Sequence, residues 1–227
     1  MSDPSAALPV PDRAEGGACP LVLLVHGRAN GEIPAELKAL ATELRRSRGA
    51  PVLLRALTDP RPADLPPFDQ PLWLVPLLLL PGEHVRQDLP RLREALRAQG
   101  RLRTLPFLGS WPSWQRALVE ELGCLVDRSW PAGAVPRLLH HPLASPLGRR
   151  YLGHLAATTG ARCQEAAYSL DPLEESLLTQ PGPVLPLALA ANRLTEALTP
   201  RFGEAAAPLL SRPALRQVLL EQLEALP

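Results

Sequence analysis

The sequence predicts an α/β protein of two tandem lobes, each a four-stranded parallel sheet with helices on both faces. Three observations lead to this fold class. Short apolar runs alternate with segments of helical periodicity, phrases from the first half return in the same order in the second, and two apolar runs lead into a histidine. The 227 residues, 46% of them hydrophobic, suffice to build two buried cores.

Four short apolar runs in the first half are typical of parallel strands. They cover residues 20–25, 52–57, 72–80 and 102–108, and His26 directly follows the first. Parallel strands are buried on both faces, so they read as near-continuous apolar stretches rather than as alternating patterns. We therefore expect these runs to form the first sheet.

Segments with helical periodicity separate these strands. They cover residues 33–48, 85–99 and 112–122. In the first of them, Pro34 suits the opening turn and Gly49 the end, because proline is tolerated at a helix start and glycine favours the position after a helix. Alternation of strands and helices predicts a parallel sheet with helices on both of its faces.

Short sequence motifs of the first half, called phrases here, recur in the same order in the second half. In both halves a helical segment follows the leading apolar phrase and ends at a glycine, Gly49 or Gly160. The alternative is two unrelated halves that share a bias toward Leu, Ala and Pro, but the common order of the phrases favours an internal duplication. The matched pairs are residues 23–29 with 138–144, 57–60 with 169–172, 75–77 with 185–187, 110–112 with 211–213, and 118–122 with 219–223.

These patterns divide the chain into three parts. Residues 1–18 are rich in Pro, Ala, Gly and acidic side chains, and we expect a flexible tail there. Residues 20–127 form the first lobe and residues 135–227 the diverged second lobe. The phrase at residues 128–136, with its prolines and glycine, is predicted to link them.

Composition argues against several classes of partner and location. The formal net charge is only +1, so no electrostatic case exists for nucleic acid or a membrane surface. Residues 1–17 lack the basic start and apolar run of a secretory signal, and the apolar run at residues 71–81 is too short to cross a bilayer. The three cysteines form no CxxC pair. We expect a cytoplasmic protein with reduced thiols.

Two histidines stand at the ends of predicted strands. His26 follows the first strand and His84 the third. If the strand order is 2-1-3-4, these strands are neighbours at the point where the order reverses, and that is where open α/β sheets bind ligands. Two neutral imidazoles there can bind a divalent metal, and one can act as a base. The alternative is that each histidine is an ordinary loop or core residue.

The same histidines carry a resemblance to a known family. Residues 23–28, Leu-Leu-Val-His-Gly-Arg, resemble the "VGHGSR" opening of the sirohydrochlorin cobaltochelatases and ferrochelatases, the class II chelatases of CbiX/SirB type. Residues 75–90, VPLLLLPGEHVRQDLP, resemble that family's "VPLFLxxGxHVxxDxP". Residues 108–112 resemble its "LGxHP", with Trp111 in place of the histidine. The resemblance covers residues 20–123 and reaches the second half through the repeat, as in the long two-lobed members.

The resemblance implies a fold and a reaction. The fold is two flavodoxin-like lobes around a cleft, and the reaction is insertion of Co²⁺ or Fe²⁺ into sirohydrochlorin or a related tetrapyrrole, in cobalamin or siroheme biosynthesis. The metal is a substrate, and no organic cofactor is implied. His26 and His84 match the metal-binding and proton-accepting residues. Arg28 and Arg86, beside the two motifs, suit the carboxylates of the tetrapyrrole, with ordinary solvent exposure as the equally weighted alternative.

The first lobe departs from the family pattern in two places. Its opening motif lacks the second glycine and the serine. The family often has a glutamate after the second strand, in a "FLE" phrase, where this chain has Ala56-Leu57-Thr58 followed by Asp59. Asp59 can substitute for that glutamate, but the matching Asp171-Pro172 favours a turn role for both aspartates.

The second lobe has lost half of the histidine pair. Residues 192–194, Asn-Arg-Leu, stand where Glu-His-Val stands in the first lobe, and His140 and His141 are followed by Pro142 instead of glycine. We therefore expect at most one working site, in the first lobe. His154 lies on a helical segment and is expected at the surface.

Two other functions are alternatives to chelation. An α/β-hydrolase requires a G-x-S-x-G elbow, which the chain does not contain. A homologue that binds a metal or a tetrapyrrole without turnover remains the alternative. Because the second lobe supplies the partner surface that single-lobe relatives obtain from a second chain, a monomer should suffice. Histidine ligands suit Co²⁺, Fe²⁺ and Ni²⁺ equally, so the sequence does not select the metal, and it does not select the tetrapyrrole.

Overall fold

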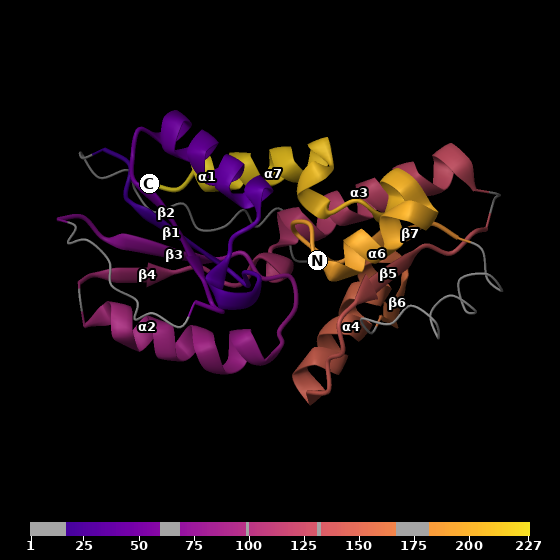
Figure 1. Ribbon diagram of the computed structural model, residues 1–227, viewed down its shortest axis with the longest axis horizontal. Coiled ribbons are helices and arrows are strands. Elements are labelled where there is room, and N and C mark those ends of the chain that lie inside the picture. The colour runs from indigo at the N-terminus through magenta and orange to yellow at the C-terminus, as the bar shows by residue number, and fades with distance from the viewer. Residues whose placement is uncertain (1–16, 60–68, 99, 131–132, 167–181) are drawn as a thin grey trace, which may run out of the picture. The chain divides into compact units, whose positions relative to one another are not determined.

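The computed structural model describes residues 17–59, 69–98, 100–130, 133–166 and 182–227 (Figure 1). The tail predicted for residues 1–18 falls mostly, and the repeated phrase at residues 169–172 wholly, outside this part of the chain. No helix in the described part is long and apolar enough to cross a bilayer.

The chain forms two compact units that are not consecutive in sequence. Unit 1 comprises Met1–Trp114 together with Gln217–Pro227, and unit 2 comprises Gln115–Arg216. Two helices therefore belong in part to each unit: α3, Pro112–Ser129, and α7, Pro213–Glu224. The segment that completes unit 1 comes from the far end of the chain.

Unit 1 contains a four-stranded parallel sheet. Its strands are β1 (Leu21–Val25), β2 (Val52–Ala56), β3 (Leu72–Pro76) and β4 (Leu102–Thr104), in the order β2-β1-β3-β4. The expected meeting of the two histidines depended on this order, in which β1 and β3 are neighbours. Every residue of β1 is at most 1% exposed, as expected for the central strand of a sheet covered on both faces.

Helices cover both faces of this sheet, as predicted. Figure 1 shows α1 (Ala35–Arg48) on one side and α2 (Leu89–Arg97) on the other. Gly49 ends α1 in the left-handed conformation, with φ of 63°. The buried core between the sheet and α2 consists of Val22, Leu24, Leu72, Leu74, Leu89 and Leu96.

The last turns of α7 are tied to α1 by one arginine. Arg48 Nη1 donates to the carbonyl oxygens of Leu223 and Leu226, both at 2.7 Å. Its Nη2 donates to the Cys19 oxygen at 2.8 Å, just before β1. Burial lowers the pKa of this guanidinium below its ordinary value. One side chain therefore joins the entry to the sheet, the first helix and the final helix of unit 1.

Unit 2 contains a smaller parallel sheet. Its strands are β5 (Arg137–His140), β6 (Arg162–Glu165) and β7 (Val184–Pro186), in the order β6-β5-β7. The helices α4 (Pro146–Thr159) and α6 (Arg193–Phe202) follow β5 and β7.

The prediction of four strands in the second lobe is wrong, because the described part of unit 2 has three. In unit 1, β4 lies in residues 98–107, between α2 and the short turn Leu108–Ser110. In unit 2 only residues 203–208 separate α6 from the matching turn Leu209–Ser211. That stretch is too short for a strand with two connections, and it forms the 3₁₀ turn Gly203–Ala206 instead.

The hydrogen bonds of the two sheets follow the same register. Leu77 N donates to Leu24 O in unit 1, and Leu187 N donates to Leu139 O in unit 2, both at 2.8 Å. Leu24 and Leu139 are thus equivalent, and His141 occupies the register of His26. This correspondence matches the alignment made from the sequence.

Several predicted boundaries shift. Helix α3 runs to Ser129 rather than ending at residue 122, so it extends into the predicted linker. Gly123 does not stop it, because a glycine inside a helix costs only about 1 kcal/mol and residues on either side favour the helix. The third strand ends at Pro76 rather than at residue 80, although the sequence stays apolar.

Candidate functional site

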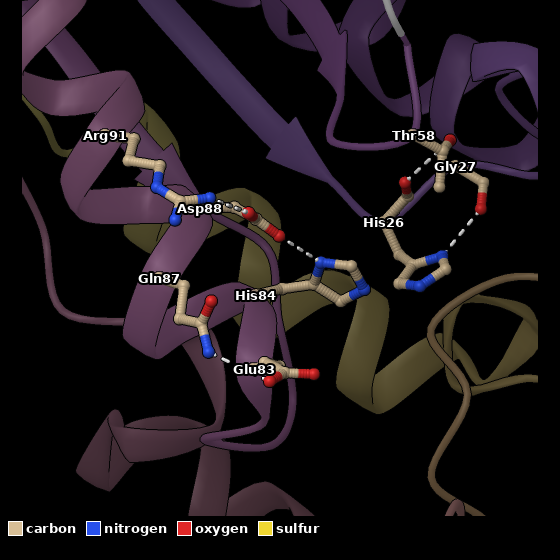
Figure 2. A network of polar contacts seen from close by, with 8 residues as sticks. All are labelled: His26, Gly27, Thr58, Glu83, His84, Gln87, Asp88 and Arg91. Carbon is tan, nitrogen blue, oxygen red and sulfur yellow. Dashed lines mark hydrogen bonds and ion pairs between the residues drawn. The ribbon is translucent and has the colours of Figure 1, made fainter.

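The sheet of unit 1 brings His26 and His84 together. His26 directly follows β1, and His84 follows β3 after a short loop. Their ring centroids are 4.5 Å apart and their planes cross at 83° (Figure 2). The strand order explains this encounter, since neighbouring parallel strands end at the same edge of a sheet.

The loop that carries His26 requires glycine at the next position. Gly27 has φ of 81°, and a Cβ there would lie 2.6 Å from both Ala56 Cβ and Thr58 Oγ1. Thr58 Oγ1 donates to the Arg28 carbonyl at 2.7 Å and lies 3.1 Å from the His26 carbonyl. The His-Gly-Arg loop is thereby held against the end of β2, which fixes the position from which the His26 ring projects.

His84 opens a π-helical turn, His84–Asp88, that leads into α2. Leu89 N donates to the His84 carbonyl, which is the wider spacing of a π turn. The Asp88 carboxylate returns to the histidine ring, with Oδ2 2.7 Å from Nδ1. Its other oxygen lies 3.9 Å from Arg91 Nη1. Sequence reasoning missed Asp88, although the four-residue spacing on a helical turn was a usable signal.

The hydrogen-bond partners assign the proton on each ring. His26 Nδ1 lies 2.7 Å from the Gly27 carbonyl oxygen. A carbonyl can only accept, and so can the ionised carboxylate beside His84, so both Nδ1 atoms carry hydrogen when the rings are neutral. Each Nε2 then has the lone pair through which an imidazole binds a metal.

The pair is open to solvent and incomplete as a metal cage. The side chains of His84 and Asp88 are 39% and 38% exposed. No group of three or more His, Cys, Asp or Glu side chains in the described part of the chain is arranged to hold a metal. Two nitrogen ligands would leave most coordination positions of a metal to water or to a substrate.

The predicted arginines lie on the same two segments as the histidines. Arg28 is exposed in the loop after Gly27, and Arg86 is exposed on the turn that begins at His84. Guanidinium groups in such positions can pair with carboxylates of a ligand.

Asp59 has a structural role. Its carboxylate lies 3.3 Å from Arg55 Nη1 and is only 7% exposed. Its backbone N–H donates to the Ala56 carbonyl in a turn after β2, and Gly31 packs so closely that a Cβ there would lie 2.7 Å from Asp59 Cβ. The turn role favoured by the sequence agrees with these contacts.

Trp111 stands where the third motif has a histidine, and its side chain belongs to the buried core. It is 1% exposed, and its indole N–H donates to the Pro106 carbonyl at 2.9 Å. A bulky buried indole has no ligand atom for a metal, so this motif contributes packing here.

The residues at the carboxyl end of the sheet in unit 2 differ from those at the same end in unit 1. His140 is buried at 4% exposure, and its Nδ1 lies 2.8 Å from the His141 carbonyl. Where unit 1 has the histidine-bearing turn, Asn192 caps α6 by accepting from Thr195 N at 3.0 Å. His154 is exposed on α4, as predicted, 3.3 Å from Gln115 Oε1.

Comparison with known proteins identifies the class of fold. No protein-family model matches the chain, and no curated protein matches it in sequence. Solved structures do match, over at least 90% of the chain, and they are chelatases or resemble chelatases. The chain therefore has the fold of the class II sirohydrochlorin chelatases of CbiX/SirB type, at low sequence identity.

Three solved structures illustrate the likeness. SirB from Bacillus subtilis with Fe³⁺ matches with a TM-score of 0.61 and 14% identity, over 90% of this chain and 94% of that one. CbiX, the terminal enzyme for biosynthesis of siroheme in denitrifying bacteria, matches with 0.58 and 19%, over 91% and 98%. DR2241 from Deinococcus radiodurans, a multi-domain protein with structural similarity to chelatases, matches with 0.54 and 18%, over 90% of this chain. The chain spans 54% of DR2241.

Proposed function

We propose that this protein inserts a divalent metal, cobalt or iron, into sirohydrochlorin or a related tetrapyrrole, in the biosynthesis of cobalamin or siroheme. The observation that carries the proposal is the encounter of His26 and His84, with ring centroids 4.5 Å apart and both Nδ1 atoms already hydrogen-bonded. The fold shared with SirB and CbiX supports it.

Metal insertion has two chemical requirements that imidazole side chains can meet. The metal ion must be held and presented to the pyrrole nitrogens, and the pyrrole N–H protons must be removed as it enters. An Nε2 lone pair can hold the ion, and a neutral imidazole can accept a proton near neutral pH. Arg28 and Arg86 would pair with carboxylates of the tetrapyrrole and orient its ring over the histidines.

The alternative is a homologue that binds metal or tetrapyrrole without turnover. The buried Trp111 at a motif histidine position favours it, because the site then has fewer titratable groups. For either function we propose a monomer, since one chain contains two sheet-bearing units, and a cytoplasmic location, since Cys19, Cys124 and Cys163 are free.

A matrix of metals and substrates tests the proposal. The full chain is incubated anaerobically with sirohydrochlorin and with Co²⁺, Fe²⁺ or Ni²⁺, and metal insertion is followed by the change in tetrapyrrole absorbance above the uncatalysed rate. Insertion of cobalt or iron supports a chelatase. Metal binding with no insertion in any combination supports the non-catalytic alternative, and light scattering of the same sample checks the monomer.

A further inference from the structure

The ring of His84 contacts the carboxylate of Asp88, a group that can determine which ring nitrogen carries the hydrogen. We propose that Asp88 is a positioning residue that holds His84 as its Nδ1–H tautomer and turns the Nε2 lone pair toward His26. The tautomer is a property of the protein with nothing bound. Its use in holding a metal rests on the proposed function.

The hydrogen bond is of the strong kind. Asp88 Oδ2 lies 2.7 Å from His84 Nδ1, at the short end of the range for charge-assisted bonds between nitrogen and a carboxylate. An ionised carboxylate has no proton to give, so the hydrogen must sit on Nδ1. The neutral ring then carries its lone pair on Nε2.

The orientation of the ring follows from the same bond. Figure 2 shows the Nδ1 side of His84 turned toward Asp88 and the opposite edge of the ring turned toward His26. The ring planes cross at 83°, and Figure 2 shows this edge of His84 facing the His26 ring. Because Asp88 holds Nδ1, Nε2 is the ring nitrogen of His84 that faces His26.

Asp88 is itself held in place by the core. The next residue, Leu89, is 8% exposed and packs among the buried residues between α2 and the sheet. Its N–H closes the π turn on the His84 carbonyl. The carboxylate is thus attached to a buried anchor, although its own side chain is partly exposed.

The opposite tautomer would disable the pair. A hydrogen on Nε2 would point from His84 at the His26 ring, and a protonated nitrogen cannot coordinate a metal. The His26 ring has a separate restraint, because its Nδ1 faces the Gly27 carbonyl at 2.7 Å. Two independent acceptors thus leave both Nε2 lone pairs available to one cation.

The same turn supplies a matched control. Gln87 Nε2 donates to Glu83 Oε1 at 2.9 Å, with the same four-residue spacing as Asp88 and His84. This pair also lies on the exposed side of the turn but does not touch a ring (Figure 2). Glu83→Ala therefore removes a comparable surface bond from the turn without removing the acceptor of His84.

The first test reads the tautomer directly, in the metal-free full chain. Histidine ring nitrogens are labelled with ¹⁵N, and long-range ¹H–¹⁵N spectra are recorded at about pH 8.5, well above the ordinary imidazole pKa of about 6.5. We expect His84 as Nδ1–H in the wild type and in Glu83→Ala. Asp88→Asn should shift it toward Nε2–H, because the carboxamide, unlike a carboxylate, can donate to Nδ1. Asp88→Ala should give a mixture, and His26 should stay Nδ1–H throughout.

The second test uses Co²⁺ alone as the probe. We expect Asp88→Ala to weaken Co²⁺ binding by about 10–100-fold, the usual effect of removing the carboxylate behind a ligating histidine, and Glu83→Ala to leave it within about twofold. Nε2–H in the wild type, an unchanged His84 tautomer in both Asp88 variants, or wild-type Co²⁺ affinity in Asp88→Ala overturns the proposal. If the wild type shows the expected tautomers but inserts no metal, the proposed function fails while the role of Asp88 in setting the tautomer stands.

Discussion

The imidazole rings of His26 and His84 meet edge to face, with their centroids 4.5 Å apart. At this distance two rings can share one ion, so they should act as a unit. We expect His84→Ala and His26→Ala each to lower kcat/KM for metal insertion by at least about 100-fold, and the double variant to lose little more.

The control for this pair is His141→Ala, since His141 occupies the register of His26 in unit 2, where Arg193 instead of a histidine stands at the position of His84. Its insertion rate should remain close to wild type. If His141→Ala is as damaging as His84→Ala, the site has been placed in the wrong unit.

Gly27 is expected to be the least replaceable residue of the site loop. Gly27→Ala adds a Cβ 2.6 Å from Ala56 Cβ and Thr58 Oγ1, at a positive φ of 81°. Left-handed strain and overpacking together should cost about 2–4 kcal/mol of unfolding free energy in urea denaturation. Gly49→Ala has a similar φ of 63° with nothing within 4 Å, so it should cost only about 1 kcal/mol. Equal costs for the two variants would contradict the close approach at Gly27.

Arg48 is expected to hold α7 in unit 1. Arg48→Ala leaves the carbonyls of Leu223, Leu226 and Cys19 without this donor, and we expect a loss of about 2–4 kcal/mol with faster hydrogen exchange in α7. Arg46→Ala, at an exposed position on the same turn of α1, should change stability by less than about 0.5 kcal/mol. Unchanged exchange in α7 for Arg48→Ala would argue against its role.

The cysteines are expected to differ in reactivity. Burial raises the pKa of the Cys163 thiol, whereas Cys124 is exposed on α3. Because the thiolate is the nucleophile, alkylation with iodoacetamide at about pH 8 should label Cys124 at least about tenfold faster than Cys163. Peptide mass spectrometry of timed samples measures both rates, and similar rates would show that Cys163 is accessible.

Alkaline pH should destabilise the protein through unit 2. Burial raises the pKa of both Cys163 and Tyr151 above their ordinary values of 9.0 and 10.0. The unfolded chain then releases these protons at lower pH than the folded chain, so stability is retained below about pH 9 and falls as the pH rises further. Urea midpoints across pH 7–10.5 should show this decline, and Cys163→Ala should reduce its slope between about pH 9 and 10.

The strands of unit 1 and the site histidines could be predicted from the sequence because both depend on local patterns, whereas the strand order entered only as a condition. Apolar runs marked β1 and β3, and the residues after them had to meet if those strands were neighbours. The missing fourth strand of unit 2 depends on the length of the connection at residues 203–208, which carries no periodic signal. The apolar residues 77–80 continue past β3 in a loop, where Leu77 and Leu78 are buried and the next two residues are partly buried.

Asp88 was missed for a different reason. Its neighbours read as an ordinary amphipathic helix, and an aspartate near a helix start has a generic explanation in the helix dipole. Asp88 matches an aspartate of the quoted motif and lies four residues after His84, but only the position of the His84 ring shows that the two side chains are bonded.

The division of the chain has a consequence for its synthesis. Unit 1 holds the histidine pair after β1 and β3, yet it includes Gln217–Pro227, which is translated after all of unit 2. Until the whole of the other half has been translated, α1 therefore lacks the helix to which Arg48 donates. A chain truncated before residue 217 would contain every residue of unit 2 but not every residue of unit 1, so the unit that begins first in the sequence is the one that is completed second.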